Sequence, residues 1–392
     1  MKDELRIAYD ARLSIGQYRG MGRYLRALIA GREQRLIGFC ASGEYDPELR
    51  LVADGSSLYP VWEQVAIPHL VRRHGIDVFI APYNTAPLRL TRGTRVVLIV
   101  HDLIFMQPLP ASRSIYQNSG RIYRRLVVPR AIAQADLILT VSRYTATSLV
   151  TQFGVHPHRL RIIPNSVEER WYVPEITDRR SNDYVLAVAG EAPSKNLNRA
   201  LEAFALCRSW GADPSLRMKV AGVKPAFHAA FVAHAHAMGV ADQVEFLPYL
   251  SDDEMRALYR GASVLFMPSL AEGFGIPVLE AMASGVPVVA SNASSLPEIG
   301  GNAACYVDPT STEHMAKILH QIVFDTGLQA RMVELGSIQA GKFHPAVIRA
   351  SIQKFWDELT NADEPSPATE LADVERAPAG AHAAFPLSHN RR

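Results

Sequence analysis

Short runs of apolar residues alternate with longer amphipathic stretches along most of the chain. The runs are continuous rather than interrupted at every second position, which is typical of strands buried on both faces of a parallel sheet. In the first half of the chain they are residues 5–9, 78–81, 96–100, 137–141 and 161–163. In the second half they are residues 184–189, 218–221, 244–247, 264–267 and 286–290. The helical stretches between them provide the crossovers that parallel strands need, so the pattern predicts an α/β fold with doubly wound parallel sheets.

A charged segment without a clear period, EERWYVPEITDRRSN at residues 168–182, separates the two series of strands. A chain of 392 residues exceeds the roughly 100–200 residues of one domain, so we place a domain boundary in this segment. After about residue 362 the composition becomes rich in Ala and Pro, which predicts a disordered tail. We expect an N-terminal domain at residues 1–170 and a C-terminal domain at residues 183–342. A last helix at residues 343–361 and the tail at residues 362–392 follow.

Composition and charge narrow the class of protein. Hydrophobic residues make up 48% and charged residues 20%, and the formal net charge of +2 is too balanced to indicate nucleic-acid binding. The cysteines Cys40, Cys207 and Cys305 lie far apart without a metal-site spacing, which fits buried thiols in a reducing cytoplasm. The N-terminus lacks a signal-peptide pattern and no apolar run approaches the ~20 residues of a membrane span. We therefore expect a cytoplasmic protein that is soluble or peripheral to a membrane.

The strongest motif is SLAEGFGIPVLEAMASGVPVVA at residues 269–290, which divides into strand end, loop, helix, turn and strand. Gly273 and Gly275 allow a tight loop with close backbone approach to a ligand. Pro277 suits the first turn of a helix, and Gly285 suits a left-handed cap at its end. The motif therefore predicts a helix directly after a glycine-rich loop.

We expect this helix to begin near Ile276, with its unpaired N–H groups directed at the loop. A helix start beyond the carboxyl end of a parallel strand is a ready phosphate site, and a nucleotide diphosphate fits there without a metal. Glu272 precedes the loop and Glu280 is expected in the first turn of the helix. Alone, these acids are a solvated loop residue and a partner for the helix dipole. Together with the glycines and proline, their placement favours a functional site.

The window EGFGIPVLEAMASGVPVVAS resembles the signature of group 1 (family 4) retaining glycosyltransferases of the GT-B fold. The resemblance extends over roughly residues 5–360 and implies two Rossmann-like domains facing across a cleft, the first on the acceptor side and the second binding a nucleotide-sugar donor. In this family the first acid, here Glu272, sits beside the transferred sugar, and the second, here Glu280, binds the ribose hydroxyls. Sugar and phosphate meet the loop backbone at Gly273, Phe274, Gly275 and the helix start at Ile276. The last helix is implied to return to the first domain.

A second segment, GEAPSKNLN, follows the predicted strand at residues 184–189. It resembles the family's loop ending in Pro-Arg-Lys-Asn, which places Lys195 on the donor pyrophosphate with Asn196 beside it. A lysine can neutralise a diphosphate as a point charge. Ser194 stands where many relatives carry Arg, which leaves one positive charge fewer at the leaving group.

Three further segments complete the expected site. VHDLIF resembles the family's His-Asp-Leu segment, whose His, here His101, lies over the donor sugar. Gly20 and Gly22 belong to a segment that resembles the Gly-x-Gly-Arg-Tyr loop lining the cleft near donor phosphates and acceptor. Tyr249 is expected to border the nucleotide base.

A basic stripe lies on a predicted helix with apolar neighbours, and its members are Arg113, Arg121, Arg124, Arg125 and Arg130. Such a stripe is either a solvated helix face or a contact with anionic lipid headgroups or a lipid-diphosphate acceptor. The second alternative implies peripheral binding at the inner face of the inner membrane.

The resemblance implies a metal-independent enzyme without a cofactor, and the chain contains no Asp-x-Asp triplet. The His-Asp-Leu and Lys-Asn segments look most like bacterial polysaccharide mannosyltransferases, which implies transfer of mannose from GDP-mannose to a saccharide or lipid-linked acceptor in surface polysaccharide (lipopolysaccharide) synthesis. UDP-glucose, UDP-N-acetylglucosamine and dTDP-rhamnose stay open as donors, as does the role of Glu272 as nucleophile or orienting group. A nucleotide-sugar epimerase of the same fold and a catalytically silent binding subunit are the alternatives.

Overall fold

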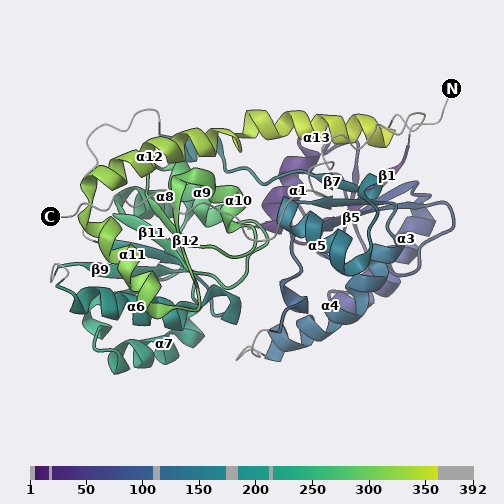
Figure 1. The fold of residues 1–392 in the computed structure, drawn as a ribbon. Helices are drawn as coiled ribbons and strands as arrows, with labels where there is room; N and C mark the ends of the chain where they lie inside the picture. The colour runs from purple at the N-terminus through teal and green to yellow at the C-terminus, as the bar shows by residue number, and fades with distance from the viewer. Residues whose placement is uncertain (1–4, 17–19, 109–114, 174–183, 212–214, 361–392) are drawn as a thin grey trace. The chain divides into compact units, whose positions relative to one another are not determined.

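The computed structural model describes residues 5–16, 20–108, 115–173, 184–211 and 215–360 (Figure 1). The predicted tail at 362–392 and most of the boundary segment at 168–182 lie outside these residues. Contacts divide the chain into two units. Among the described residues, the first unit contains residues up to 107, residues 115–165 and residues 348–360, and the second contains residue 108 and residues 166–347.

The described part of the first unit contains a parallel sheet of seven strands in the order β3-β2-β1-β4-β5-β6-β7. Its strands are β1 (Ile7–Asp10), β2 (Ile37–Cys40), β3 (Leu51–Ala53), β4 (Val78–Ala81), β5 (Arg95–Val100), β6 (Leu137–Thr140) and β7 (Leu160–Ile162). The five strands predicted in this half occur within two residues of their predicted ends. The sequence pattern missed β2 and β3, because β2 is a four-residue run interrupted by Gly38 and β3 is three residues long at the edge. A Cβ at Gly38 would lie 2.7 Å from Cδ2 of Leu51, so a larger residue there would require this side chain to move.

Helices cover both faces of this sheet (Figure 1). They are α1 (Met21–Ile29), α2 (Tyr59–Val61), the π-helix η1 (Trp62–Ala66), α3 (Ile67–His74), η2 (Ile104–Met106), α4 (Ile115–Gln134) and α5 (Arg143–Phe153). Apolar side chains of η1, α3, α4 and α5 form one buried cluster with the strands. Ser142 caps α5 by accepting a hydrogen bond from the Thr145 N–H.

The last helix, α13 (Pro345–Thr360), packs against the first unit. The indole Nε1 of Trp356, 2% exposed, donates to the Leu28 carbonyl of α1 at 2.8 Å. Arg161 and Glu358 form an ion pair at 2.7 Å, and Arg95 donates to the Leu359 carbonyl at 3.2 Å. A helix remote in sequence therefore completes the core of the first unit.

The second unit contains, in its described part, a parallel sheet of six strands in the order β10-β9-β8-β11-β12-β13. Its strands are β8 (Tyr184–Val188), β9 (Arg217–Ala221), β10 (Val244–Phe246), β11 (Val264–Met267), β12 (Val288–Ser291) and β13 (Ala304–Val307). All five predicted strands of this half occur, and β13 was missed because ACYV mixes small and aromatic residues at the sheet edge.

Two helical layers enclose the second sheet (Figure 1). Helices α6 (Leu197–Ser209), α7 (Pro225–Ala237) and α11 (Thr312–Phe324) contribute to one layer. The other contains α8 (Asp252–Gly261), α9 (Ile276–Ala283), α10 (Leu296–Gly300) and α12 (Thr326–Gly341). The sequence-based prediction of two Rossmann-like domains is therefore confirmed. Ser251 and Glu254 form a capping box at the start of α8.

No helix within the described residues is long and apolar enough to cross a membrane.

Replacing Trp356 by Ala is expected to destabilise the first unit by roughly 3–5 kcal/mol, because the change leaves a large cavity and an unpaired carbonyl. Chemical denaturation followed by fluorescence or circular dichroism measures the loss. Lys354→Ala, an exposed change on the same helix, is the control and should alter stability by less than ~0.5 kcal/mol. Equal denaturation midpoints for the two variants would show that the α13 contact is dispensable.

Candidate functional site

The loop after β11 has the local structure that its sequence predicts. Gly275 adopts φ 112°, and a Cβ there would lie 2.6 Å from the Leu296 side chain, so only glycine fits. Helix α9 begins at Ile276 with Pro277 in its first turn, and Gly285 follows it at φ 71°. The N-terminal N–H groups of α9 therefore point to the carboxyl edge of the sheet, where ligands of parallel sheets bind.

Glu272 and Lys195, which the sequence placed on two separate loops, meet at this edge. The Lys195 Nζ donates to Glu272 Oε1 at 2.7 Å, with 28% and 10% of the respective side chains exposed. Lys195 ends the short helix η5 (Pro193–Lys195) after β8, and the Leu270 N–H donates to the Ser194 carbonyl at 2.7 Å. Backbone and side chains thus join the two loops.

Asn196 directly after Lys195 adopts the left-handed conformation, φ 59°. Its amide group donates to the carbonyl oxygens of Pro268 at 2.9 Å and Pro309 at 2.7 Å, and its side-chain oxygen accepts from Arg199 at 3.1 Å. These bonds occupy the amide within the protein and fix the direction in which Lys195 leaves the loop.

Glu280 is not in the first turn of α9, where we expected it, but in the second. A residue there is too far along the helix to complement the N-terminal dipole, which acts within the first turn. Its carboxylate accepts a hydrogen bond of 2.8 Å from the hydroxyl of the fully buried Tyr259. Burial and the nearby Glu280 charge raise the pKa of Tyr259 well above its usual value, so this hydroxyl keeps its proton. Tyr259 packs edge-on against Trp171, with ring centroids 5.2 Å apart.

Phe274, between the two loop glycines, is buried and packs edge-on against Phe343 at a centroid distance of 5.7 Å. Phe343 belongs to the segment that connects α12 to α13. The position of the loop is therefore coupled to that connection by an aromatic contact. Tyr249, in the connection between β10 and α8, is 65% exposed.

His101 lies in the first unit, at the carboxyl end of β5. Its ring is buried, donates from Nε2 to the Pro82 carbonyl at 2.9 Å and stacks edge-on with Tyr24 at 5.1 Å. Burial lowers the pKa of His101, against smaller opposing effects of the Pro82 bond and the Asp102 charge. The ring is therefore neutral near pH 7, with Nε2 protonated and Nδ1 available as an acceptor.

Gly20 and Gly22 lie at the start of α1 in the same unit. Gly20 is the N-cap, with φ 47°, and Gly22 is buried in the helix. The three residues before Gly20 are outside the described part.

A buried polar cluster lies near the carboxyl ends of β1 and β4. Glu63, placed inward by the π-helix η1, accepts hydrogen bonds from the hydroxyls of Tyr59 at 2.9 Å and Tyr123 at 2.5 Å and from Thr85. Burial raises the pKa of Glu63, although these hydrogen bonds oppose the shift. Arg12 pairs with Asp10 at 2.9 Å, and its guanidinium lies 4.7 Å from the Tyr59 ring centroid. No sequence motif predicted this cluster, because contacts between residues far apart in the sequence form it.

The basic stripe lies on α4 as predicted, except for Arg113, which lies outside the described residues. Arg121 and Arg125 both donate to the carbonyls of Phe105 and Gln107, so they hold the η2 segment. Two apolar residues one turn apart, Ile122 and Leu126, are 63% and 58% exposed.

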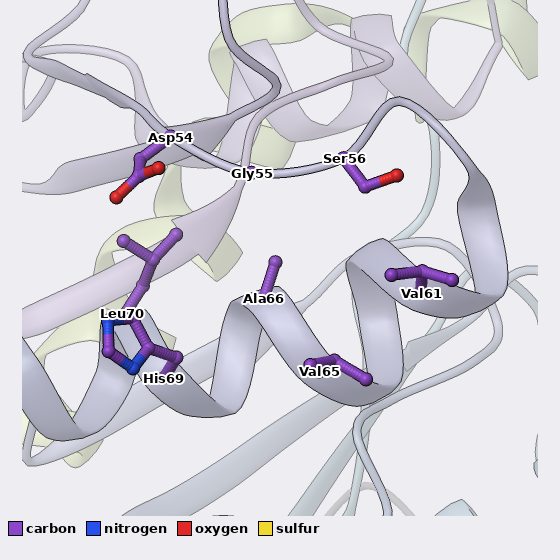
Figure 2. A pocket seen from close by; sticks show the side chains of 8 residues that line it. All are labelled: Asp54, Gly55, Ser56, Val61, Val65, Ala66, His69 and Leu70. Carbon is purple, nitrogen blue, oxygen red and sulfur yellow. The ribbon is translucent and has the colours of Figure 1, made fainter.

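A cavity of about 290 Å³ in the first unit contains none of the predicted site residues. Figure 2 shows its apolar side chains on the α2–α3 segment and Asp54 and Ser56 on the facing chain. Its lining offers few groups that bind a charged ligand. Among the described residues, no cluster of three or more His, Cys, Asp and Glu side chains has the arrangement of a metal site.

Two family models match the chain. The model described as Glycosyl transferases group 1 matches residues 171–337, and the model described as Glycosyltransferase Family 4 matches residues 19–171. The MMP alpha-(1->4)-mannosyltransferase of Mycolicibacterium hassiacum is 30% identical over 203 residues, which cover 49% of this chain and 47% of that protein. The O-antigen chain mannosyltransferase RfbU of Salmonella typhimurium is 27% identical over 252 residues, 64% of this chain and 66% of that protein. The matched part is thus less than two thirds of either relative.

The fold is also that of solved structures. HepE of Anabaena, crystallised in complex with UDP-glucose, aligns with a TM-score of 0.70 and 17% identity over 90% of this chain and 100% of that chain. The predicted GT-B fold, with two Rossmann-like domains, is confirmed by this similarity.

The lowered pKa of His101 predicts a pH-dependent loss of stability. The unfolded chain takes up a proton near the ordinary value of 6.5, whereas the buried ring resists it, so folding stability falls as the pH drops below that value. Between about pH 7.5 and about pH 5.5 the free energy of unfolding of the wild type should fall further than that of His101→Gln. Denaturant unfolding at several pH values measures this difference. Parallel pH profiles for the two proteins would mean that the ring takes up a proton as readily in the folded state as in the unfolded chain.

Proposed function

The chain belongs to the group 1 glycosyltransferases of family 4, and from that premise we propose that it transfers a sugar from a nucleotide-sugar donor with retention of configuration. The observation that carries the proposal is the Lys195–Glu272 ion pair at the carboxyl edge of the second sheet, one loop away from the start of α9. A cation, a carboxylate and a helix N-terminus converge there, which suits a diphosphate attached to a sugar.

The donor diphosphate binds at the loop backbone of Gly273, Phe274 and Gly275 and at the α9 start at Ile276. Lys195 neutralises the leaving group, and Asn196 contributes by holding Lys195 in place rather than by contacting the donor. Glu280 accepts hydrogen bonds from the ribose hydroxyls, with its orientation fixed by Tyr259. The amides and Lys195 stabilise the charge that develops on the departing diphosphate, which is the role of a metal in other transferases.

The transfer step conserves atoms and charge. An acceptor hydroxyl oxygen forms a bond to the anomeric carbon while the bond from that carbon to the diphosphate oxygen breaks, and the hydroxyl proton passes to the diphosphate on the same face. Glu272 orients the sugar beside this centre. His101, neutral, offers Nδ1 to a hydroxyl of the donor sugar, and Gly20 and Gly22 allow the α1 start to approach the ligand. Tyr249 borders the base.

Mannose is the sugar that we propose, with GDP-mannose as donor. The support is that the two sequence relatives described above are named mannosyltransferases, one of them for the O-antigen chain. The acceptor is then a saccharide or a lipid-diphosphate-linked glycan of a bacterial surface polysaccharide, built on the cytoplasmic side of the membrane. The UDP-glucose complex of HepE keeps a uridine donor as the competing candidate.

The proposal is tested by comparing Glu272→Gln with wild type in transfer and in binding. Transfer should fall at least ~100-fold, because a group that acts on the reacting sugar is lost. The affinity for GDP, measured by calorimetry, should be unchanged or tighter, since the substitution releases Lys195 from its ion pair. Glu245→Gln, which removes an exposed carboxylate 3.8 Å from Lys219, is the matched control and should leave both quantities unchanged. Turnover by Glu272→Gln near the wild-type rate would refute the assignment.

The same assay separates the alternative activities. Wild type is offered GDP-mannose, UDP-glucose, UDP-N-acetylglucosamine and dTDP-rhamnose, each with and without acceptor and with EDTA. Transfer from one donor that survives EDTA is expected. Consumption of UDP-N-acetylglucosamine without acceptor indicates an epimerase, binding without turnover indicates a silent subunit, and activity restored by Mg²⁺ or Mn²⁺ indicates a metal-dependent enzyme.

We further propose that α4 brings the protein to anionic membranes through its arginines and the exposed pair Ile122 and Leu126. Flotation with anionic vesicles should show binding that weakens as salt rises, because exposed charges are screened over about 10 Å at 0.1 M salt. The double substitution Ile122→Ser/Leu126→Ser should reduce binding without disturbing the η2 segment. Ile338→Ser, an equally exposed residue of α12, is the control. If the wild type binds anionic vesicles no better than neutral ones, the basic stripe is a solvated helix face and the proposal is wrong.

A further inference from the structure

The turn between β12 and α10 holds the loop that carries Glu272. The Ser294 hydroxyl oxygen accepts a hydrogen bond from the Glu272 backbone N–H at 2.8 Å. The neighbouring Ser295, which is fully buried, donates from its hydroxyl toward the carbonyl oxygens of Glu272 at 3.1 Å and Phe274 at 2.8 Å. Both backbone polar groups of Glu272 are therefore held by side chains that lie 22 and 23 positions further along the chain.

Ser294 adopts a backbone conformation that disfavours serine. Its φ is 53°, in the left-handed region where an L-residue other than Gly, Asn or Asp is strained. Among the described residues the other non-glycine residues with positive φ are Asn84 and Asn196. Glycine would adopt this φ without strain but has no hydroxyl for the Glu272 N–H. The hydroxyl contact accounts for a serine at a position where glycine is the easier residue.

We infer that Ser294 and Ser295 are positioning residues for transfer: they fix the backbone of Glu272 so that its carboxylate stays beside Lys195 and the reacting sugar. This inference rests on the proposed function, because it assigns Glu272 to the transferred sugar. The two serines act through Glu272 and not on the donor. Because the N–H and the carbonyl of Glu272 are both fixed, the position of its carboxylate depends only on the side-chain torsion angles. Such placement matters because a shift of about 1 Å at a reacting group can lower the rate about 100-fold.

The substitution Ser294→Gly separates positioning from folding. It permits the same φ and relieves the strain, but removes the hydrogen-bond acceptor. We expect the melting temperature to stay the same or rise, kcat to fall roughly 10-fold or more, and the Kd for the nucleoside diphosphate to change little. Ser294→Asn, whose side chain tolerates positive φ and offers an acceptor oxygen, should recover part of kcat. Ser291→Ala is the matched control, since Ser291 is buried in the same segment but donates to Ser269 at 2.6 Å and not to Glu272.

Hydrogen exchange of the Glu272 amide tests the contact without relying on activity. The amide should be protected in wild type and in Ser291→Ala, and should exchange faster in Ser294→Gly. Unchanged protection in Ser294→Gly would overturn the inference whatever the activity, as would a wild-type kcat in that variant. A fall in kcat that only follows a fall in melting temperature would also overturn it. A wild type that transfers no sugar from any donor, with the amide behaving as expected, would reject the proposed function and leave a purely structural clamp.

Discussion

The candidate donor site of this chain depends on one ion pair, Lys195 with Glu272. Both groups are largely buried, and each keeps the other from being an uncompensated charge in a partly desolvated loop. A pair of this kind requires its two loops to be fixed relative to each other. The bond from Leu270 to the Ser194 carbonyl, the amide of Asn196 and the serines after β12 all serve that requirement. In the proposed donor complex Lys195 would gain a second anionic partner, and until then the ion pair with Glu272 keeps its ammonium group oriented.

The sequence was sufficient to predict those helices and strands that are determined by their own residues. The glycines and the proline around α9 set its start and its end, and continuous apolar runs located ten strands. Strands β2, β3 and β13 escaped because glycine or small side chains interrupt their apolar runs, and their pairing partners supply the stability. The register of each of these strands is set by pairing with its neighbours in the sheet and cannot be predicted from the segment alone.

The candidate site likewise contains residues that the sequence predicted and residues that only the structure shows. Motifs predicted Glu272, Lys195 and Glu280 as site residues. The ion pair between Lys195 and Glu272 could not be predicted, because its partners are 77 positions apart. The turn of α9 on which Glu280 lies was misjudged by one, since Glu280 is the fifth residue of a helix that begins at Ile276, where its start was predicted. Tyr259, Ser294 and Ser295 lie outside the motif, and their roles follow from contacts across the fold. The only sequence feature at Ser294 and Ser295 is that two serines precede Leu-Pro-Glu. This feature does not indicate a role for them unless the backbone angles are known.

The aromatic contact between Phe274 and Phe343 has a mechanical consequence. Phe274 is flanked by glycines in the loop after β11, and Phe343 lies where the chain leaves α12 for α13. Helix α13 is anchored in the first unit by Trp356. A ligand that stiffens the glycine-flanked loop therefore also restrains one end of the polypeptide crossing between the units. The contact that joins the loop to this connection is apolar, so it carries no charge and is insensitive to salt.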